Sequence, residues 1–150
     1  MYPKNRKAFT MIELVFVIVV IGILSAIAIP KFAVTRGDAL ITKAKATLAS
    51  VRSSLATERQ KRILRGEFTD IGDLGSGTTY AFSNFDNNSS HPVLEYPIKQ
   101  CPTGGQACWR RVNATQYEYY FPTSGSAKFK LDNNRFVCDN DTADCEILTQ

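Results

Sequence analysis

The most regular pattern in the chain is an apolar segment close to its N-terminus. From Phe9 to Pro30 the sequence runs for about 20 residues, enough to cross a bilayer as a helix at 1.5 Å per residue. Its one charged residue is Glu13, near the start. We predict a transmembrane helix over residues 9–30. A carboxylate in hydrocarbon costs about 2.5 to 3.5 kcal/mol, so Glu13 is a candidate functional residue; the alternative is an interfacial side chain that snorkels to water.

Beyond the apolar segment, hydrophobic residues recur at three- and four-residue spacing, which indicates an amphipathic helix. These residues are Leu40, Ala44, Leu48, Val51 and Leu55. We predict that the helix continues as a stem over residues 31–66 and ends near Arg65, with Gly66 as its stop. Pro30 removes one backbone donor and Gly37 loosens the next turn, so a helix kink is expected there.

From Thr78 onward the pattern changes to short β-prone runs separated by turn residues. The predicted strands are Thr79 to Phe82, Val93 to Ile98, Trp109 to Val112, Gln116 to Phe121, Ala127 to Leu131 and Arg135 to Cys138. Turns at Ser124-Gly125 and at residues 132–134 make the last three runs an antiparallel meander. The expected fold class is α+β, with a long N-terminal helix packed on a small antiparallel β head over residues 67–150.

Charge divides along the chain. Residues 31–66 hold nine Lys or Arg against two acids, a net of +7, whereas residues 67–150 hold six against eleven, a net of −5. A basic stripe of this kind can bind nucleic acid phosphates. Interleaved aromatic residues for base stacking are missing, which favours a solvated helix face that meets the acidic head of a neighbouring subunit. The stripe comprises Lys43, Lys45, Arg52, Arg59, Lys61, Arg62 and Arg65.

Four cysteines, Cys101, Cys108, Cys138 and Cys145, lie in the polar C-terminal part. Their even number suits an oxidising periplasm or exterior, and it sets the expected orientation because basic residues flank the apolar helix on both sides. The two C-x6-C spacings favour bridges Cys101–Cys108 and Cys138–Cys145, with a crossed pairing as the alternative. A zinc site is disfavoured, since its ligands are commonly two to four residues apart.

Few residues suggest cofactor or enzyme chemistry. Asp139, Asp141 and Asp144 alternate in a short loop that could hold Ca²⁺, although acidic turns are usually just solvated. The single histidine, His91, precedes a proline and is expected to be a solvated loop residue. With neither a phosphate loop nor a dinucleotide fingerprint, we predict that the chain is not an enzyme and carries no cofactor other than this possible calcium.

The N-terminal residues K-A-F-T-M-I-E-L-V, followed by Gly22 and Pro30, resemble the class III signal of type IV pilins and type II secretion pseudopilins. The resemblance implies that a prepilin peptidase cuts between Ala8 and Phe9, removing a leader of residues 1–8, and that Phe9 is N-methylated. It also implies that Glu13 neutralises the Phe9 amine of a neighbouring subunit during assembly. The family most often has Gly before the cut, so Ala8 bears on the rate of processing.

The resulting prediction is a structural subunit of a type II secretion pseudopilus, most similar to a major pseudopilin, a class that often holds calcium in a C-terminal loop. The expected partners are other subunits, the prepilin peptidase, an inner-membrane assembly platform and, before assembly, the lipid bilayer. The head would lie in the periplasm below a single inner-membrane helix. A type IV or competence pilus subunit acting in adhesion or DNA uptake is the first alternative. A Sec-exported or membrane-anchored periplasmic binding protein is the second, since Ala26-Ile27-Ala28 fits a signal peptidase site.

Overall fold

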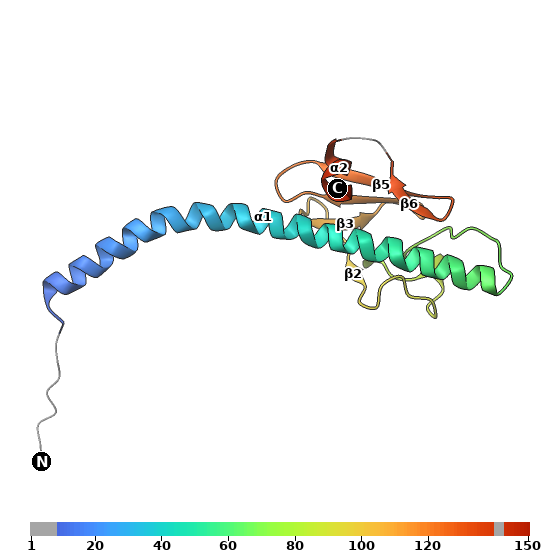
Figure 1. The fold of residues 1–150 in the computed structure, drawn as a ribbon, viewed down its shortest axis with the longest axis horizontal. Helices are drawn as coiled ribbons and strands as arrows, with labels where there is room; N and C mark the ends of the chain where they lie inside the picture. Colours follow the sequence, from blue (N-terminus) through green and yellow to red (C-terminus); the bar gives the residue numbers. More distant parts are fainter. Residues whose placement is uncertain (1–8, 140–142) are drawn as a thin grey trace, which may run out of the picture. The chain divides into compact units, whose positions relative to one another are not determined.

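The computed structural model describes residues 9–139 and 143–150, and the chain forms two compact units. The first ends at Arg36 and the second spans Gly37–Gln150. One helix, α1 (Met11–Leu64), supplies the ordered part of the first unit and then the stem of the second (Figure 1). The expected α+β class, a long N-terminal apolar helix followed by a small antiparallel sheet, is confirmed.

The C-terminal end of α1 is a complete helix-stop motif. The Gly66 amide donates to the Ile63 carbonyl at 3.0 Å, and the Glu67 amide donates to the Arg62 carbonyl at 2.9 Å. Gly66 has a φ of +78°, the left-handed region that glycine adopts without strain. This pair of bonds satisfies carbonyls that the helix itself leaves open, so the predicted stop at Gly66 is confirmed.

The second unit contains a four-stranded antiparallel meander. Its strands follow one another in space as they do in sequence: β3 (Cys108–Arg111), β4 (Gln116–Tyr120), β5 (Ser126–Asp132) and β6 (Arg135–Cys138). A separate two-stranded ribbon pairs β1 (Tyr80–Phe82) with β2 (Ile98–Lys99). In the turn between β5 and β6, Asn133 and Asn134 have positive φ, as expected for a tight hairpin turn.

The core of this unit lies between the second half of α1 and the sheet. The helix contributes Leu48, Val51 and Leu55, each at most 2% exposed, so the predicted apolar stripe does cover the sheet. The sheet contributes aromatic residues that contact one another at ring-centroid distances of about 5 to 6 Å. They include Phe82, Trp109, Tyr117, Tyr119, Phe129 and Phe136. This compact aromatic core needs few residues, which suits a small head.

Three predictions about the second unit were incomplete or wrong. The run Val93 to Ile98 is a strand only at its last residue, because Pro92 and Pro97 cannot donate to a sheet ladder. A short 3₁₀ turn (Phe85–Asn87) and a C-terminal helix, α2 (Ala143–Thr149), were not expected. The polar segment from Gly72 to Pro92, expected to be the most mobile or variable loop, carries buried residues of the core.

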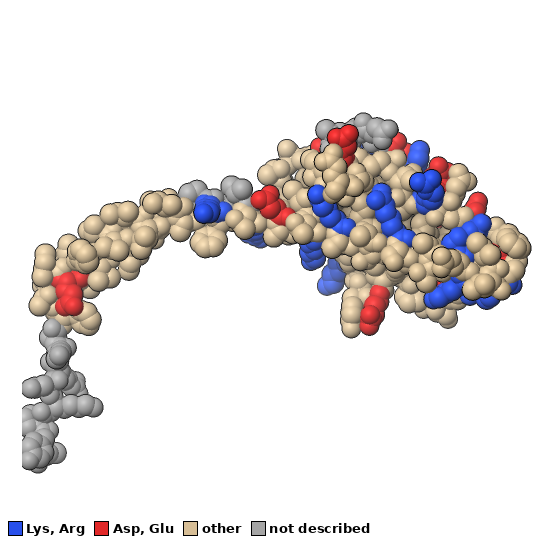
Figure 2. Space-filling model, viewed as in Figure 1, with Lys and Arg blue, Asp and Glu red and all other residues tan. Residues whose placement is uncertain are grey.

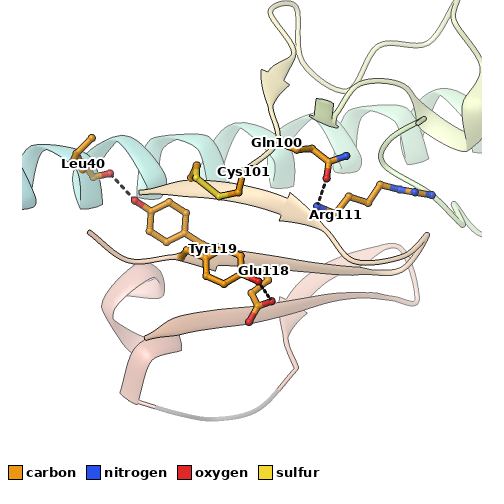
Figure 3. The surroundings of a disulfide bond; sticks show 8 residues. Leu40, Gln100, Cys101, Arg111, Glu118 and Tyr119 are labelled. Carbon is orange, nitrogen blue, oxygen red and sulfur yellow. Dashed lines mark hydrogen bonds between the residues drawn. A yellow bond between two sulfur atoms is a disulfide. The ribbon is translucent and has the colours of Figure 1, made fainter. Parts of the chain in front are cut away.

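In the structure Cys101 is bonded to Cys108, and Cys138 is bonded to Cys145, with Cα–Cα distances of 5.5 and 6.2 Å. This is the pairing that the spacing favoured. Figure 3 shows the first bridge tying the segment that follows Gln100 to the start of β3. Near it the Tyr119 hydroxyl donates to the Leu40 carbonyl of α1 at 3.3 Å, a polar link between helix and sheet.

Candidate functional site

The surface of the first unit is almost entirely apolar. Side chains from Met11 to Ile29 form a span of 19 residues with a mean hydropathy of 3.0, none of it buried by the rest of the chain. Met11 is 83% exposed and Ile27 is 69% exposed. Figure 2 shows uncharged side chains over this part of α1, interrupted near its start by an acidic group. A helix this long and apolar, by length and composition, can cross a membrane.

Glu13 lies in the first turn of α1, three residues after Thr10. The Glu13 amide donates to the Thr10 hydroxyl at 3.3 Å, and the Leu14 amide donates to the Thr10 carbonyl at 3.2 Å. Thr10 therefore caps the helix, and Thr10 and Glu13 have the spacing of a capping box. A carboxylate in this first turn is also favoured by the positive end of the helix dipole. The local structure thus holds Glu13 at the start of an exposed apolar helix.

The remaining predicted assembly and processing residues are placed only in part. Phe9 is described and is 80% exposed, whereas Ala8 lies outside the described residues. The helical pattern of α1 continues through Pro30 and Gly37 without interruption. The kink expected at these two residues stays a prediction.

The acidic loop near the C-terminus does not support a calcium site. Asp139 is engaged in an ion pair with Lys130 at 3.2 Å, and Asp141 lies outside the described residues. In the part of the chain that the structure describes, no three His, Cys, Asp or Glu side chains gather as a metal-binding group around Asp144 or elsewhere.

A buried ion cluster that the sequence interpretation missed lies where α1 meets the segment from Gly72 to Pro92. Glu58 is 5% exposed and accepts from Arg62 Nε at 3.1 Å and from His91 Nδ1 at 2.9 Å. Arg62 also pairs with Asp86 at 2.8 Å, and Arg65 approaches Glu58 at 3.7 Å. The expectation that His91 and Arg62 are solvated was therefore wrong, because both are held by Glu58.

Electrostatics within the cluster match its geometry. Burial alone would raise the pKa of Glu58, but the hydrogen bonds from His91 and Arg62 outweigh it and lower that pKa below the ordinary value. Burial opposes the charge on Arg62 too, yet its bonds to Asp86 and Glu58 raise its pKa. The charges compensate one another inside the unit, which marks the cluster as structural.

Asp86 organises the loop side of this cluster. Its carboxylate accepts from the backbone amides of Gly72 at 2.7 Å and Asp73 at 2.9 Å, while its other oxygen binds Arg62. Asp86 has a φ of +48°, a left-handed conformation that an aspartate adopts at some cost. The strain is offset by three hydrogen bonds to two other segments.

A second buried network fixes the same loop to the sheet. Arg111 binds both carboxylate oxygens of Asp73, with Nε at 3.1 Å. The Tyr117 hydroxyl donates to Asp73 at 3.1 Å and accepts from the Leu74 amide at 2.9 Å. Burial and the neighbouring Asp73 charge raise the pKa of Tyr117, so the phenol stays protonated and can donate.

No local sequence signal identifies either network, since their members are separated by 33 residues for Glu58 and His91 and by 38 for Asp73 and Arg111. The one usable hint is the placement of Glu58 and Arg62 in line with the apolar stripe, where a salt-bridged i, i+4 pair can be buried. Both networks position the loop. The residues free for function are consequently on the exposed surfaces.

The fold defines a class: an exposed apolar N-terminal helix with one acid in its first turn, continued as the stem of a small disulfide-bonded antiparallel head. The model of the prokaryotic N-terminal methylation motif matches residues 3–29. The chain is 52% identical over 88 residues to the type IV narrow pilus major component PilA5 of Thermus thermophilus, covering 57% of this chain and 76% of that protein.

Two fimbrial proteins of Pseudomonas aeruginosa are each 41% identical over 64 residues, which covers 43% of this chain and 39% of theirs. No solved structure matches the chain. The chain belongs to the type IV pilin family. The family is one of structural proteins that are processed by a prepilin peptidase and assemble into filaments.

Proposed function

We propose that this chain is a subunit of a type IV pilus, stored in the inner membrane with its head in the periplasm and polymerised through the apolar half of α1. The observation that carries the proposal is the 19-residue exposed apolar span that starts beside Glu13. At 1.5 Å per residue this span is about 28 Å long, close to the thickness of the hydrocarbon core. The same surface that a bilayer covers before assembly is available to neighbouring helices afterwards.

The pilus is favoured over the pseudopilus by the relatives, whose names are those of a pilus component and of fimbrial proteins. The type II secretion pseudopilus remains a prediction from the sequence, and the missing support for calcium among the described residues removes one argument for it. The competence and binding-protein alternatives likewise gain no specific observation.

In the proposed mechanism, the leader of residues 1–8 is removed and Phe9 becomes the methylated N-terminus. The Glu13 carboxylate of one subunit then pairs with the Phe9 amine of its neighbour. Opposite charges attract strongly at low dielectric, whereas each is costly to bury alone, so the pair sets the axial register of the incoming helix. Membrane helix before assembly, stem and head keep the proposed bounds of residues 9–30, 31–66 and 67–150.

Mass analysis of sheared filaments tests this mechanism. The expected mature chain begins at methylated Phe9, and Glu13→Ala is expected to remain in the membrane, processed, but absent from filaments. Thr10→Ser, which keeps the helix cap, is the matched control and should assemble normally. A mature chain that begins elsewhere, such as Ile29, or normal assembly of Glu13→Ala would contradict the proposal.

A further inference from the structure

One flank of α1 in the second unit carries a groove of about 400 Å³ between the helix and β6. Its floor is apolar, because Leu55 and Phe136 are only 1% and 2% exposed. Arg52 and Arg135 stand at its edge. The groove therefore combines an apolar surface with two cations, a combination suited to a partner that carries an acid beside a hydrophobic group.

The two arginines are uncompensated. Arg52 uses its Nε to donate to the Phe136 carbonyl at 3.0 Å, which leaves its terminal nitrogens for another acceptor. None of the ion pairs within residues 9–139 and 143–150 involves Arg52 or Arg135. Burial, and then the Arg135 charge, lower the pKa of Arg52, so the two guanidinium groups repel each other across the groove. A carboxylate placed between them would relieve this repulsion.

The acids nearest in the fold already have partners. Asp132 faces Arg135 in the β5–β6 register but accepts from Asn133 at 3.1 Å. Asp70 is held by Asn134 and lies 3.8 Å from Arg59. The Asn134 amide is fully used, since its oxygen also accepts from the backbone of the neighbouring loop at 2.7 Å.

The opposite flank of α1 carries a protruding acid and aromatic in sequence, Glu95 and Tyr96. Tyr96 is 80% exposed, an unusual state for an aromatic on a small head, and Glu95 is also exposed. Neither side chain makes a hydrogen bond or ion pair with the described part of the chain, although their loop borders Ser50 and Ser54 of α1. This Glu95–Tyr96 knob has the chemistry that the groove lacks.

Helix geometry places the knob and the groove back to back. Successive residues of an α-helix are about 100° apart, so Arg52 points about 160° to 200° away from Ser50 and Ser54. The Glu95–Tyr96 knob of one molecule therefore cannot enter its own groove. Two different patches on opposite flanks make a head-to-tail contact, which does not close between two copies and extends into an open polymer.

We infer that the Glu95–Tyr96 knob of one copy of this chain docks into the Arg52–Arg135 groove of the next copy in the filament. This rests on the proposed function as a filament subunit. The Glu95 carboxylate accepts from both guanidinium groups, and the Tyr96 ring covers the floor made by Leu55 and Phe136. Figure 2 shows Lys and Arg side chains gathered over the second half of α1 and beside it, the general setting of this contact.

Disulfide trapping in assembled filaments tests the contact directly. The described chain has no free cysteine, so Tyr96→Cys combined with Ala56→Cys introduces one new pair. On mild oxidation this full-length variant is expected to give a ladder of dimers, trimers and higher oligomers on non-reducing gels. Tyr96→Cys combined with Val112→Cys, which is exposed just after β3 and does not line the groove, is the matched control and should stay monomeric.

Charge reversal supplies a second readout. Glu95→Arg is expected to lower the filament yield about tenfold or more, and adding Arg135→Glu should restore it, because a close charge pair is recovered. Glu146→Arg, an exposed acid on α2, is the control for net charge and should assemble normally. Filaments that assemble normally in Glu95→Arg and give no ladder would overturn this inference while leaving the pilus function intact.

Two other outcomes also have a fixed meaning. Absence of filaments from the unaltered chain would contradict the proposed function itself. Arginine variants of the groove that assemble normally but lose DNA binding, measured with duplex DNA on purified filaments, would show that the groove binds nucleic acid instead and would overturn the inference.

Discussion

Replacing Arg62 by methionine tests whether the buried ion cluster stabilises the head. Methionine has a similar length but removes the ion pairs to Glu58 and Asp86, at 3.1 and 2.8 Å. Glu58 is 5% exposed and would keep its charge with only His91 and the more distant Arg65 as partners. Removing one member of a buried pair typically costs about 3 to 5 kcal/mol, since the other charge is left without compensation.

The position of the cluster sets the expected value at the lower end of this range. The carboxylate lines an open pocket of about 410 Å³ together with Lys61 and Arg65, so water and nearby cations reach part of it. We expect Arg62→Met to lower the free energy of unfolding by about 2 to 3 kcal/mol, or about 10 °C in the midpoint of a head of this size. Asp86 loses its only side-chain partner in the helix at the same time, which frees the loop that it organises.

Urea unfolding of the full chain in detergent micelles measures this loss. The single tryptophan, Trp109, is 2% exposed in the aromatic core, so its fluorescence reports the head. Lys61→Met is the matched control, because Lys61 is exposed and belongs to no ion pair of the described residues; its effect should stay within about 0.5 kcal/mol. Equal stability of the Arg62→Met and Lys61→Met variants would refute the structural role of the cluster.

Three further predictions follow from the same unit. Since the folded pKa of Glu58 is below its ordinary value of 4.5, its stabilising contribution is present above that pH and is lost as the pH falls through the folded pKa, so Glu58→Gln should flatten the acid limb of a pH–stability curve; an unchanged limb would count against it. Tyr117→Phe leaves Asp73 and the Leu74 amide short of a partner and should cost about 1 to 3 kcal/mol in urea unfolding, a result that an unchanged midpoint would exclude. Replacing both cysteines of the Cys138–Cys145 bridge by serine should cost about 2 to 3 kcal/mol, whereas no change in the melting midpoint would show that this short loop contributes little.

The regular elements could be predicted because their patterns are local. Leu48, Val51 and Leu55 repeat at helical spacing, and the buried and exposed residues of β5 alternate as its sequence does. The stop at Gly66 needed only the residue that tolerates a positive φ. Each of these signals lies within a few residues, where periodicity and turn chemistry decide the structure.

The polar networks could not be predicted because they depend on the path of an irregular segment. His91 reaches Glu58 only after the chain turns at Asp86, whose left-handed conformation no residue pattern announces. Arg111 and Asp73 meet only because the same segment packs against the sheet. A polar loop in sequence was therefore a buried part of the structure, and its charged residues were assigned to solvent for want of a visible partner.

The two glutamates of α1 show how the same residue type serves folding in one unit and, in our proposal, assembly in the other. Glu58 is buried among cations supplied by its own chain, which compensate its charge inside a single molecule. Glu13 has a capped backbone, but its carboxylate belongs to no ion pair within the described residues, and the helix surface that follows it is apolar. A carboxylate that must enter a low-dielectric environment without a cation from its own helix needs one from a neighbour, and the methylated amine of Phe9 is a cation that carries its charge at the start of the same apolar surface.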